Sequence, residues 1–126
     1  MGRAMKTGPD ASIVMGNANM GLGRVDAMSG ARPAAEAHFQ TAMTLYAAAG
    51  ASSEARHGLM VVAEQLGNLQ KEKGDLQAAT REYSRSLDIA RELDQLRSSP
   101  GTQGDVETES LLYGLTLASA GRAEES

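Results

Sequence analysis

The sequence contains no cysteine and no tryptophan, and aromatic residues make up only 3% of its 126 residues. The absence of cysteine excludes disulfides, cysteine-ligated zinc and thiol catalysis. Two histidines, His38 and His57, are too few for a histidine-rich metal site. The scarcity of aromatic rings argues against a surface on which bases or sugars stack. We therefore expect no metal, no cofactor and no nucleic acid among the ligands of this protein.

Positive charge and long apolar runs are also scarce. The 12 Lys and Arg are outnumbered by 16 Asp and Glu, which gives a formal net charge of −4. This balance argues against a basic surface that binds nucleic-acid phosphates. No stretch approaches the ~18 to 20 apolar residues of a membrane span, and the amino terminus lacks the pattern of a signal peptide. We expect a soluble, intracellular, cytoplasmic protein with no membrane partner.

Glycine, by contrast, is abundant, and several of its 14 occurrences are regularly spaced. Three pairs of glycines lie seven residues apart, namely Gly23 with Gly30, Gly67 with Gly74, and Gly114 with Gly121. The first two pairs are 44 residues apart and the last two 47. In the first two units, the second glycine is followed by an alanine and then an aromatic residue, which gives Ala35 and Phe39, and Ala79 and Tyr83. Internal repetition on this length scale is typical of stacked structural units.

Each repeated position has a physical explanation in a pair of packed helices. A glycine inside a helix costs about 1 kcal/mol relative to alanine, so the first glycine of each pair predicts a close approach by a neighbouring helix. The second glycine fits the left-handed residue that ends a helix. The alanine keeps the second helix close to the first, and the aromatic residue fills the space toward the next helix. The sequence therefore predicts helical hairpins that stack on copies of themselves.

Helical spacing and capping residues predict five helices, at about 11–29, 33–49, 52–73, 76–97 and 105–120. We expect Ser52 or Ser53, Asp75 and Asp105 to cap helices, and residues 98–104 to form a loop. The last helix is apolar around most of its circumference, with a narrow polar side at Glu109, Thr116 and Ser119. Such a helix is expected to be buried on more than one side.

The repeated residues follow a known pattern through one whole unit, carried by Leu66-Gly67-Asn68, Gly74-Asp75, Ala79, Tyr83 and Ser86-Leu87. A first unit follows it less closely, through Leu22-Gly23, Gly30, Ala35, Phe39 and Ala42. This pattern resembles the tetratricopeptide repeat, in its longer-period branch with the kinesin light chains and cell-polarity adaptors. The resemblance implies an all-α fold, an α-solenoid of stacked antiparallel helix hairpins with two full repeats and a partial third. We expect a disordered segment at 1–10 and a repeat domain at 11–126, with repeats at about 16–50, 60–97 and 105–126.

Neither histidine stands in a catalytic arrangement. His38 and His57 have no serine, cysteine or paired carboxylate at catalytic spacing. Glu36 and His38 are two residues apart, so they lie on different faces of a helix and cannot bind one ligand together. We expect both histidines to be surface or packing residues, and the sequence predicts a protein that is not an enzyme.

In stacked hairpins of the tetratricopeptide type, the first helix of each unit lines a concave surface. The resemblance therefore implies partner-binding residues at Asn17, Met20, Arg24, Val61, Glu64, Asn68, Lys71, Leu111 and Leu115. Asn68 is the strongest single candidate, because an asparagine can hydrogen-bond both the N–H and the C=O of an extended peptide. The corresponding positions carry no pair of cations, which argues against a receptor for the carboxylate of a chaperone tail.

These observations predict an interaction module, an adaptor or scaffold that binds a protein or peptide partner through the concave face. Two alternatives fit the same sequence. In the first, the apolar helix at 105–120 assembles the chain into a homo-oligomer. In the second, the chain is a fragment of a larger regulatory protein that contains tetratricopeptide repeats.

Overall fold

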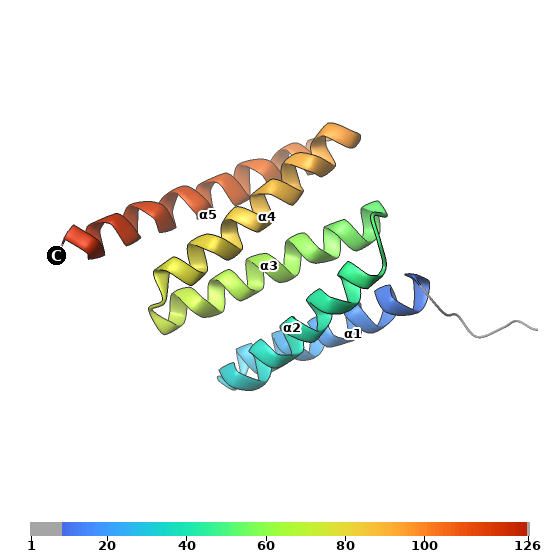
Figure 1. Cartoon of the computed structure of the whole chain (residues 1–126), viewed down its shortest axis with the longest axis horizontal. Coiled ribbons are helices and arrows are strands. Elements are labelled where there is room, and N and C mark those ends of the chain that lie inside the picture. Colours follow the sequence, from blue (N-terminus) through green and yellow to red (C-terminus); the bar gives the residue numbers. More distant parts are fainter. Residues whose placement is uncertain (1–8, 126) are drawn as a thin grey trace, which may run out of the picture. The chain divides into compact units, whose positions relative to one another are not determined.

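The computed structural model describes residues 9–125, and every regular element within that range is an α-helix. The five helices are α1 (Pro9–Met28), α2 (Arg32–Ala48), α3 (Ser53–Lys73), α4 (Leu76–Leu96) and α5 (Pro100–Glu125) (Figure 1). The predicted all-α class is confirmed. Of the segment predicted to be disordered, Pro9 and Asp10 begin α1, and residues 1–8 lie outside the described range.

The chain divides into two compact units at Val62. The first unit contains α1, α2 and the beginning of α3. The second contains the rest of α3, α4 and α5. Within the first unit α1 and α2 form an antiparallel pair, and within the second unit α4 and α5 pack side by side (Figure 1).

The helix ends at Gly30 and Gly74 have the predicted left-handed conformation. Their φ values are +84° and +86°. The amide after each glycine donates to the carbonyl five residues back, from Ala31 to Asp26 over 2.8 Å and from Asp75 to Gln70 over 2.9 Å. This paired bonding satisfies carbonyls that the end of a helix would otherwise leave without partners. Two turns of the repeat are therefore built in the same way.

In each unit the repeated aromatic ring lies directly on the first glycine of its own pair, and not toward the next helix as expected, because the missing side chain of the glycine leaves room for the ring. A Cβ added to Gly23 would lie 2.6 Å from Cε1 of Phe39, and one added to Gly67 would lie 2.7 Å from Cε1 of Tyr83. In both units the ring comes 16 residues after the glycine. We call Gly23 and Gly67 the ring-facing glycines. Both rings are fully buried, so each forms the centre of its unit's core.

Two of the predicted helix caps are present. The Ser52 hydroxyl accepts a hydrogen bond from the Ala55 amide over 3.2 Å, and the Asp75 carboxylate accepts one from the Ala78 amide over 3.0 Å. Such caps are worth about 1 kcal/mol each, because they satisfy amides in the first helical turn.

The beginning of α5 differs from the prediction, since the helix begins at Pro100 rather than near Asp105. Pro100 suits a first helical position, where its missing N–H has no intrahelical partner anyway. The Ser99 hydroxyl accepts from the Thr102 amide over 3.1 Å, and the Thr102 hydroxyl donates to Asp94 of α4 over 2.7 Å. Most of the predicted loop at 98–104 is therefore helical, and Ser99 is the cap in place of Asp105.

The end of α5 also differs from the prediction. The helix continues through Gly121 to Glu125, and positive φ among the glycines of residues 9–125 occurs at Gly30, Gly50 and Gly74. Glycine adopts the right-handed helical conformation as well as the left-handed one, so its spacing alone does not end a helix.

The polar side of α5 is the side that is buried. Glu109 is 2% exposed and Thr116 is fully buried, whereas Leu111, Leu115 and Leu117 are all exposed. The expectation that this helix is covered on several apolar sides is therefore wrong for the structure described. The repeat register explains the orientation, because Glu109 and Thr116 lie 47 residues after Val62 and Leu69, which are buried in α3.

Candidate functional site

The residues predicted to bind a partner all have side chains that reach solvent. On α1 and the first part of α3 these are Asn17, Met20, Arg24 and Val61, and in the second unit they are Glu64, Asn68, Lys71, Leu111 and Leu115. Their spacings of three and four residues place each set along one side of its helix. Within each unit they form an accessible strip, and their role in binding stays a prediction.

Two of these residues, Asn17 and Asn68, are joined to tyrosines of the next helix. The Tyr46 hydroxyl donates to Oδ1 of Asn17, and the Tyr83 hydroxyl donates to Oδ1 of Asn68. Burial, followed by the nearby charge of Glu64, raises the pKa of Tyr83 to about 12, so its hydroxyl remains a donor. Because their oxygens accept these bonds, the asparagines have a packing role that the sequence analysis missed.

A repeated dipeptide could have revealed this role. Gly16-Asn17 and Gly67-Asn68 both place a glycine under a tyrosine ring and an acceptor beside the tyrosine hydroxyl. A Cβ on Gly16 would lie 2.9 Å from the Tyr46 ring, which is close enough to require a shift. The match is hard to see in the sequence because Tyr46 follows Phe39 by two helical turns and falls outside the repeated aromatic position.

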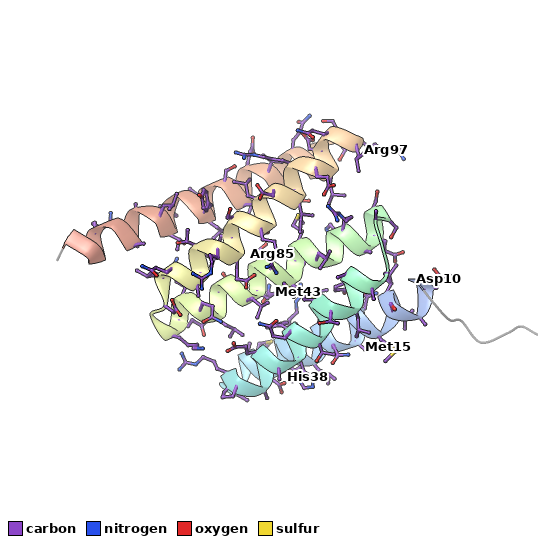
Figure 2. All side chains as sticks on the ribbon, in the orientation of Figure 1. Asp10, Met15, His38, Met43, Arg85 and Arg97 are labelled. Atoms are coloured by element: carbon purple, nitrogen blue, oxygen red, sulfur yellow. The ribbon has the colours of Figure 1, made fainter. Side chains whose placement is uncertain are left out.

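A small hollow in the first unit carries negative charge. It is lined by Ile13, Val14 and Asn17, together with the carboxylates of Asp10 and of Glu54 on α3. Asp10 is labelled at the beginning of α1 in Figure 2. Two carboxylates beside an apolar wall suit a lysine or arginine side chain, whose methylene groups pack while its charge is neutralised. This hollow extends the predicted strip of Asn17 toward the amino-terminal end of α1.

A buried acid lies beneath the strip in the second unit. Glu109 of α5 faces Glu64 of α3 and Ser86 of α4. Burial, together with a hydrogen bond to the Glu64 carboxyl, raises the pKa of Glu109 to about 8. Glu109 therefore keeps its proton at neutral pH and can donate it in the hydrogen bond to the Glu64 carboxyl.

Apolar side chains are exposed on the first and the last helix. On α1 they are Val14, Met15, Leu22, Val25 and Met28, and on α5 they are Leu111, Leu115 and Leu117. Met15 is labelled on α1 in Figure 2. The apolar residues of α1 share one side of that helix, and Leu111 and Leu115 share one side of α5. Such surfaces are of the kind that another protein covers.

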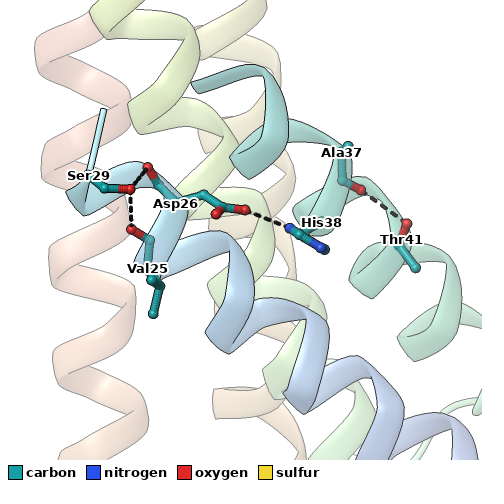
Figure 3. Close-up of polar contacts among 6 residues, drawn as sticks. All are labelled: Val25, Asp26, Ser29, Ala37, His38 and Thr41. Carbon is teal, nitrogen blue, oxygen red and sulfur yellow. Dashed lines mark hydrogen bonds and ion pairs between the residues drawn. The ribbon is translucent and has the colours of Figure 1, made fainter. Parts of the chain in front are cut away.

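His38 is a packing residue, as predicted. Its Nδ1 lies 2.7 Å from Oδ2 of Asp26, so the pair ties α2 to the end of α1 (Figure 3). The Ser29 hydroxyl donates to the carbonyls of Val25 and Asp26 at the same helix end, over 3.1 Å in each case. These contacts stabilise the first turn of the repeat.

Within residues 9–125, no three His, Asp or Glu side chains gather in a way that could hold a metal ion. None of the helices in this range is both long and apolar enough to cross a membrane. Comparisons with protein-family models, with curated proteins and with solved structures found no match for this chain.

Proposed function

We propose that the chain is a non-enzymatic interaction module, a short α-solenoid of helix hairpins similar to tetratricopeptide repeats, which binds a peptide or helix. The observation that carries this proposal is the ring-facing glycine, which recurs with the same turn and the same 16-residue spacing in two units. Repetition of both the packing contact and the turn supports a modular array, whose usual use is to present side chains to a partner.

The partner contacts in this proposal are made by the accessible strip within each unit. Arg24 and Lys71 supply positive charge, Glu64 supplies a carboxylate, and Leu111 and Leu115 supply apolar contacts. Asn68 contributes its amide nitrogen, because its oxygen already accepts from Tyr83. This mixture suits an extended peptide held by backbone hydrogen bonds and anchored by an apolar side chain.

A double substitution tests the strip without disturbing the core. Asn68→Asp retains the oxygen acceptor for Tyr83 and removes the amide donors, and Arg24→Ala removes an exposed cation. We expect the double variant to lose most of the partners that the unmodified chain captures in a quantitative pull-down. The matched control is Gln40→Ala with Gln95→Ala, on exposed positions of the second helices α2 and α4. Retention of every partner by the double variant would contradict binding along the strip.

A second candidate function, assembly into a homo-oligomer through residues 105–120, is favoured by the exposure of Leu111, Leu115 and Leu117. Replacing Leu111 and Leu115 with Gln should then dissociate the oligomer without unfolding the chain. An oligomer that survives both substitutions, measured by light scattering, would exclude this assembly.

A further inference from the structure

Helix α5 carries a glycine in the register of the two ring-facing glycines, but no ring lies on it. Gly23 is covered by Phe39, and Gly67 is covered by Tyr83. Gly114 follows Gly67 by 47 residues, and no atom of the described residues lies within 4 Å of its Cβ position. The chain therefore contains three glycines at the same repeat position. An aromatic ring covers two of them, and none covers the third.

Gly114 lies at the centre of an apolar surface of α5, where its missing side chain leaves a depression between larger neighbours. Leu111 and Leu117 flank it at three residues on either side, and they are 62% and 44% exposed. Ala118 and Gly121, four and seven residues further on, share its side of the helix. We call these five residues the open face of α5. Large side chains beside a glycine and an alanine are the arrangement into which a side chain from another helix packs.

A hollow in the second unit continues this face toward α4. It is lined by Leu117, Ala120 and Gly121 of α5 and by Gln77, Thr80 and Arg81 of α4. Arg81 is exposed and places a positive charge at the rim of the hollow. A helix on the open face would therefore gain from an acidic residue at this end.

At Gly16, Gly23 and Gly67 the next residue matches the chemistry of the ring that covers the glycine. Gly58 also lies under the Tyr46 ring and is followed by Leu59, but the Tyr46 hydroxyl donates to Asn17 instead. Gly16 and Gly67 are followed by asparagines, and both lie under tyrosines whose hydroxyls donate to those asparagines. Gly23 is followed by Arg24 and lies under phenylalanine, which has no hydroxyl. Gly114 is followed by Leu115, whose side chain offers no acceptor. A buried tyrosine hydroxyl would lack a partner there, so the position favours phenylalanine.

We propose that the open face of α5 binds an amphipathic helix of a protein partner, and that this helix inserts a phenylalanine ring onto Gly114. The two occupied sites indicate the rest of its pattern, with a small residue four positions before the ring and another three positions after it. A second copy of the chain is a poor source of the ring, because Phe39 is the only phenylalanine in the sequence and is fully buried. This binding shares Leu111 with the strip along the first helices, but it does not involve Arg24, Asn68 or the other residues of that strip.

A helical peptide with the sequence of residues 75–97 and the change Tyr83→Phe is a suitable probe. It carries the required small residues as Ala79 and Ser86, and a side-chain staple on its exposed face keeps it helical. Fluorescence anisotropy with the whole chain should give saturable binding. The peptide with Tyr83 unchanged should bind about tenfold more weakly, because its hydroxyl would lack an acceptor. A peptide with Tyr83→Ala should not bind.

Gly114→Ala in the chain is the decisive variant, because its methyl group would occupy the position of the ring. We expect it to lower the affinity for the probe at least tenfold, while the chain remains folded by circular dichroism. Gly104→Ala, on the same helix and also without a neighbour within 4 Å, is the matched control and should bind normally. The Arg24→Ala and Asn68→Asp variant should also bind normally, which separates this site from the proposed strip.

Three results would overturn the proposal. The first is that the stapled phenylalanine probe does not bind. The second is that the probe binds the Gly114→Ala chain as tightly as the unmodified chain, which would happen if the probe displaced α4 instead. The third is a dimer of the unmodified chain, seen by light scattering, that Gly114→Ala dissociates, because a second copy would then cover this face.

Discussion

Helices α3 and α5 carry the same glycine in the same register, yet only α3 has a ring on it. Gly67 lies under the buried ring of Tyr83, whereas Gly114 faces open space. The residues that follow them also differ, since Asn68 after Gly67 is half-buried and its counterpart Leu115 after Gly114 is exposed. The repeated glycine therefore marks where a helix can approach, but it does not by itself ensure that a helix lies there.

The buried sides of the two helices differ as well. Val62 and Leu69 of α3 are buried apolar residues, and their counterparts Glu109 and Thr116 in α5 are buried polar ones. Oε1 of Glu109 and Oγ1 of Thr116 have no hydrogen-bond partner among the described residues. Burying a polar atom without a partner costs about 1 to 3 kcal/mol, so these two atoms reduce the stability that the buried side of α5 contributes.

The largest expected difference between the two helices is a pH dependence that α5 confers through Glu109. The unfolded chain gives Glu109 an ordinary pKa near 4.5, and the folded chain raises that pKa to about 8. Between these values the folded state holds more protons, so the free energy of unfolding falls as pH rises, by roughly 1.4 kcal/mol per pH unit at most. This contribution is fully present below about pH 4.5 and is lost as pH passes about 8.

Urea unfolding of the unmodified chain and of Glu109→Gln at several pH values measures this effect. Glutamine stays neutral, so its profile should be flatter and the variant more stable than the parent at pH 8. Glu107→Gln, on the exposed side of α5, is the control and should follow the parent. Parallel profiles for the parent and Glu109→Gln would show that Glu109 titrates normally in the folded chain.

A methyl group beneath an occupied ring should also destabilise the chain. Gly67→Ala places a Cβ 2.7 Å from the Tyr83 ring, and Gly23→Ala places one 2.6 Å from Phe39. Both rings are fully buried and cannot move without disturbing their unit, so we expect losses of about 1 to 3 kcal/mol. Denaturant unfolding gives the number, and unchanged midpoints would mean that the rings do not lie on these glycines.

Removing the hydrogen bond between Tyr83 and Asn68 should lower the free energy of unfolding by a smaller amount. Tyr83→Phe leaves the ring on Gly67 and removes the hydroxyl that Asn68 accepts, so the chain should lose about 1 kcal/mol. The double variant with Asn68→Leu should regain part of this loss, since Leu115 holds the same position in α5. Additive losses from the two changes would contradict the coupling of this pair.

Replacing Thr116 with valine should raise the stability of the chain and make the buried side of α5 more like that of α3. Its hydroxyl is fully buried and has no partner among the described residues, so Thr116→Val removes an unpaired polar atom at nearly constant volume. We expect the variant to be more stable by up to about 1 kcal/mol, measured by thermal unfolding. A loss of stability would mean that the hydroxyl has a hydrogen-bond partner.

Local features of the fold could be predicted from the sequence. The turns at Gly30 and Gly74 and the caps at Ser52 and Asp75 depend on residues close in the chain, and the structure confirms them. The close approach at Gly23 and Gly67 could be predicted from the repeated spacing, but the rings that make it were expected to face the next helix. The all-α class follows from these elements.

Features of α5 that depend on distant residues could not be predicted. Its beginning at Pro100 rests on the bond from Thr102 to Asp94 of the preceding helix. Its buried polar side rests on packing in the second unit, which overrides the apolar pattern of the helix itself. In the candidate site, accessibility followed from helical spacing, but the bond from Tyr83 to Asn68 joins two helices and has no signal in either one alone.

The most direct test compares Gly67→Ala and Gly114→Ala in parallel urea unfolding of the whole chain. Gly67→Ala should lower the stability, because a ring lies on that glycine. Gly114→Ala should raise it by up to about 1 kcal/mol, because alanine favours the helix and meets no neighbour among the described residues. Opposite changes in stability would support the account, in which a ring covers Gly67 and nothing covers Gly114. A loss of stability in both variants would show that Gly114 is already covered and would contradict the account.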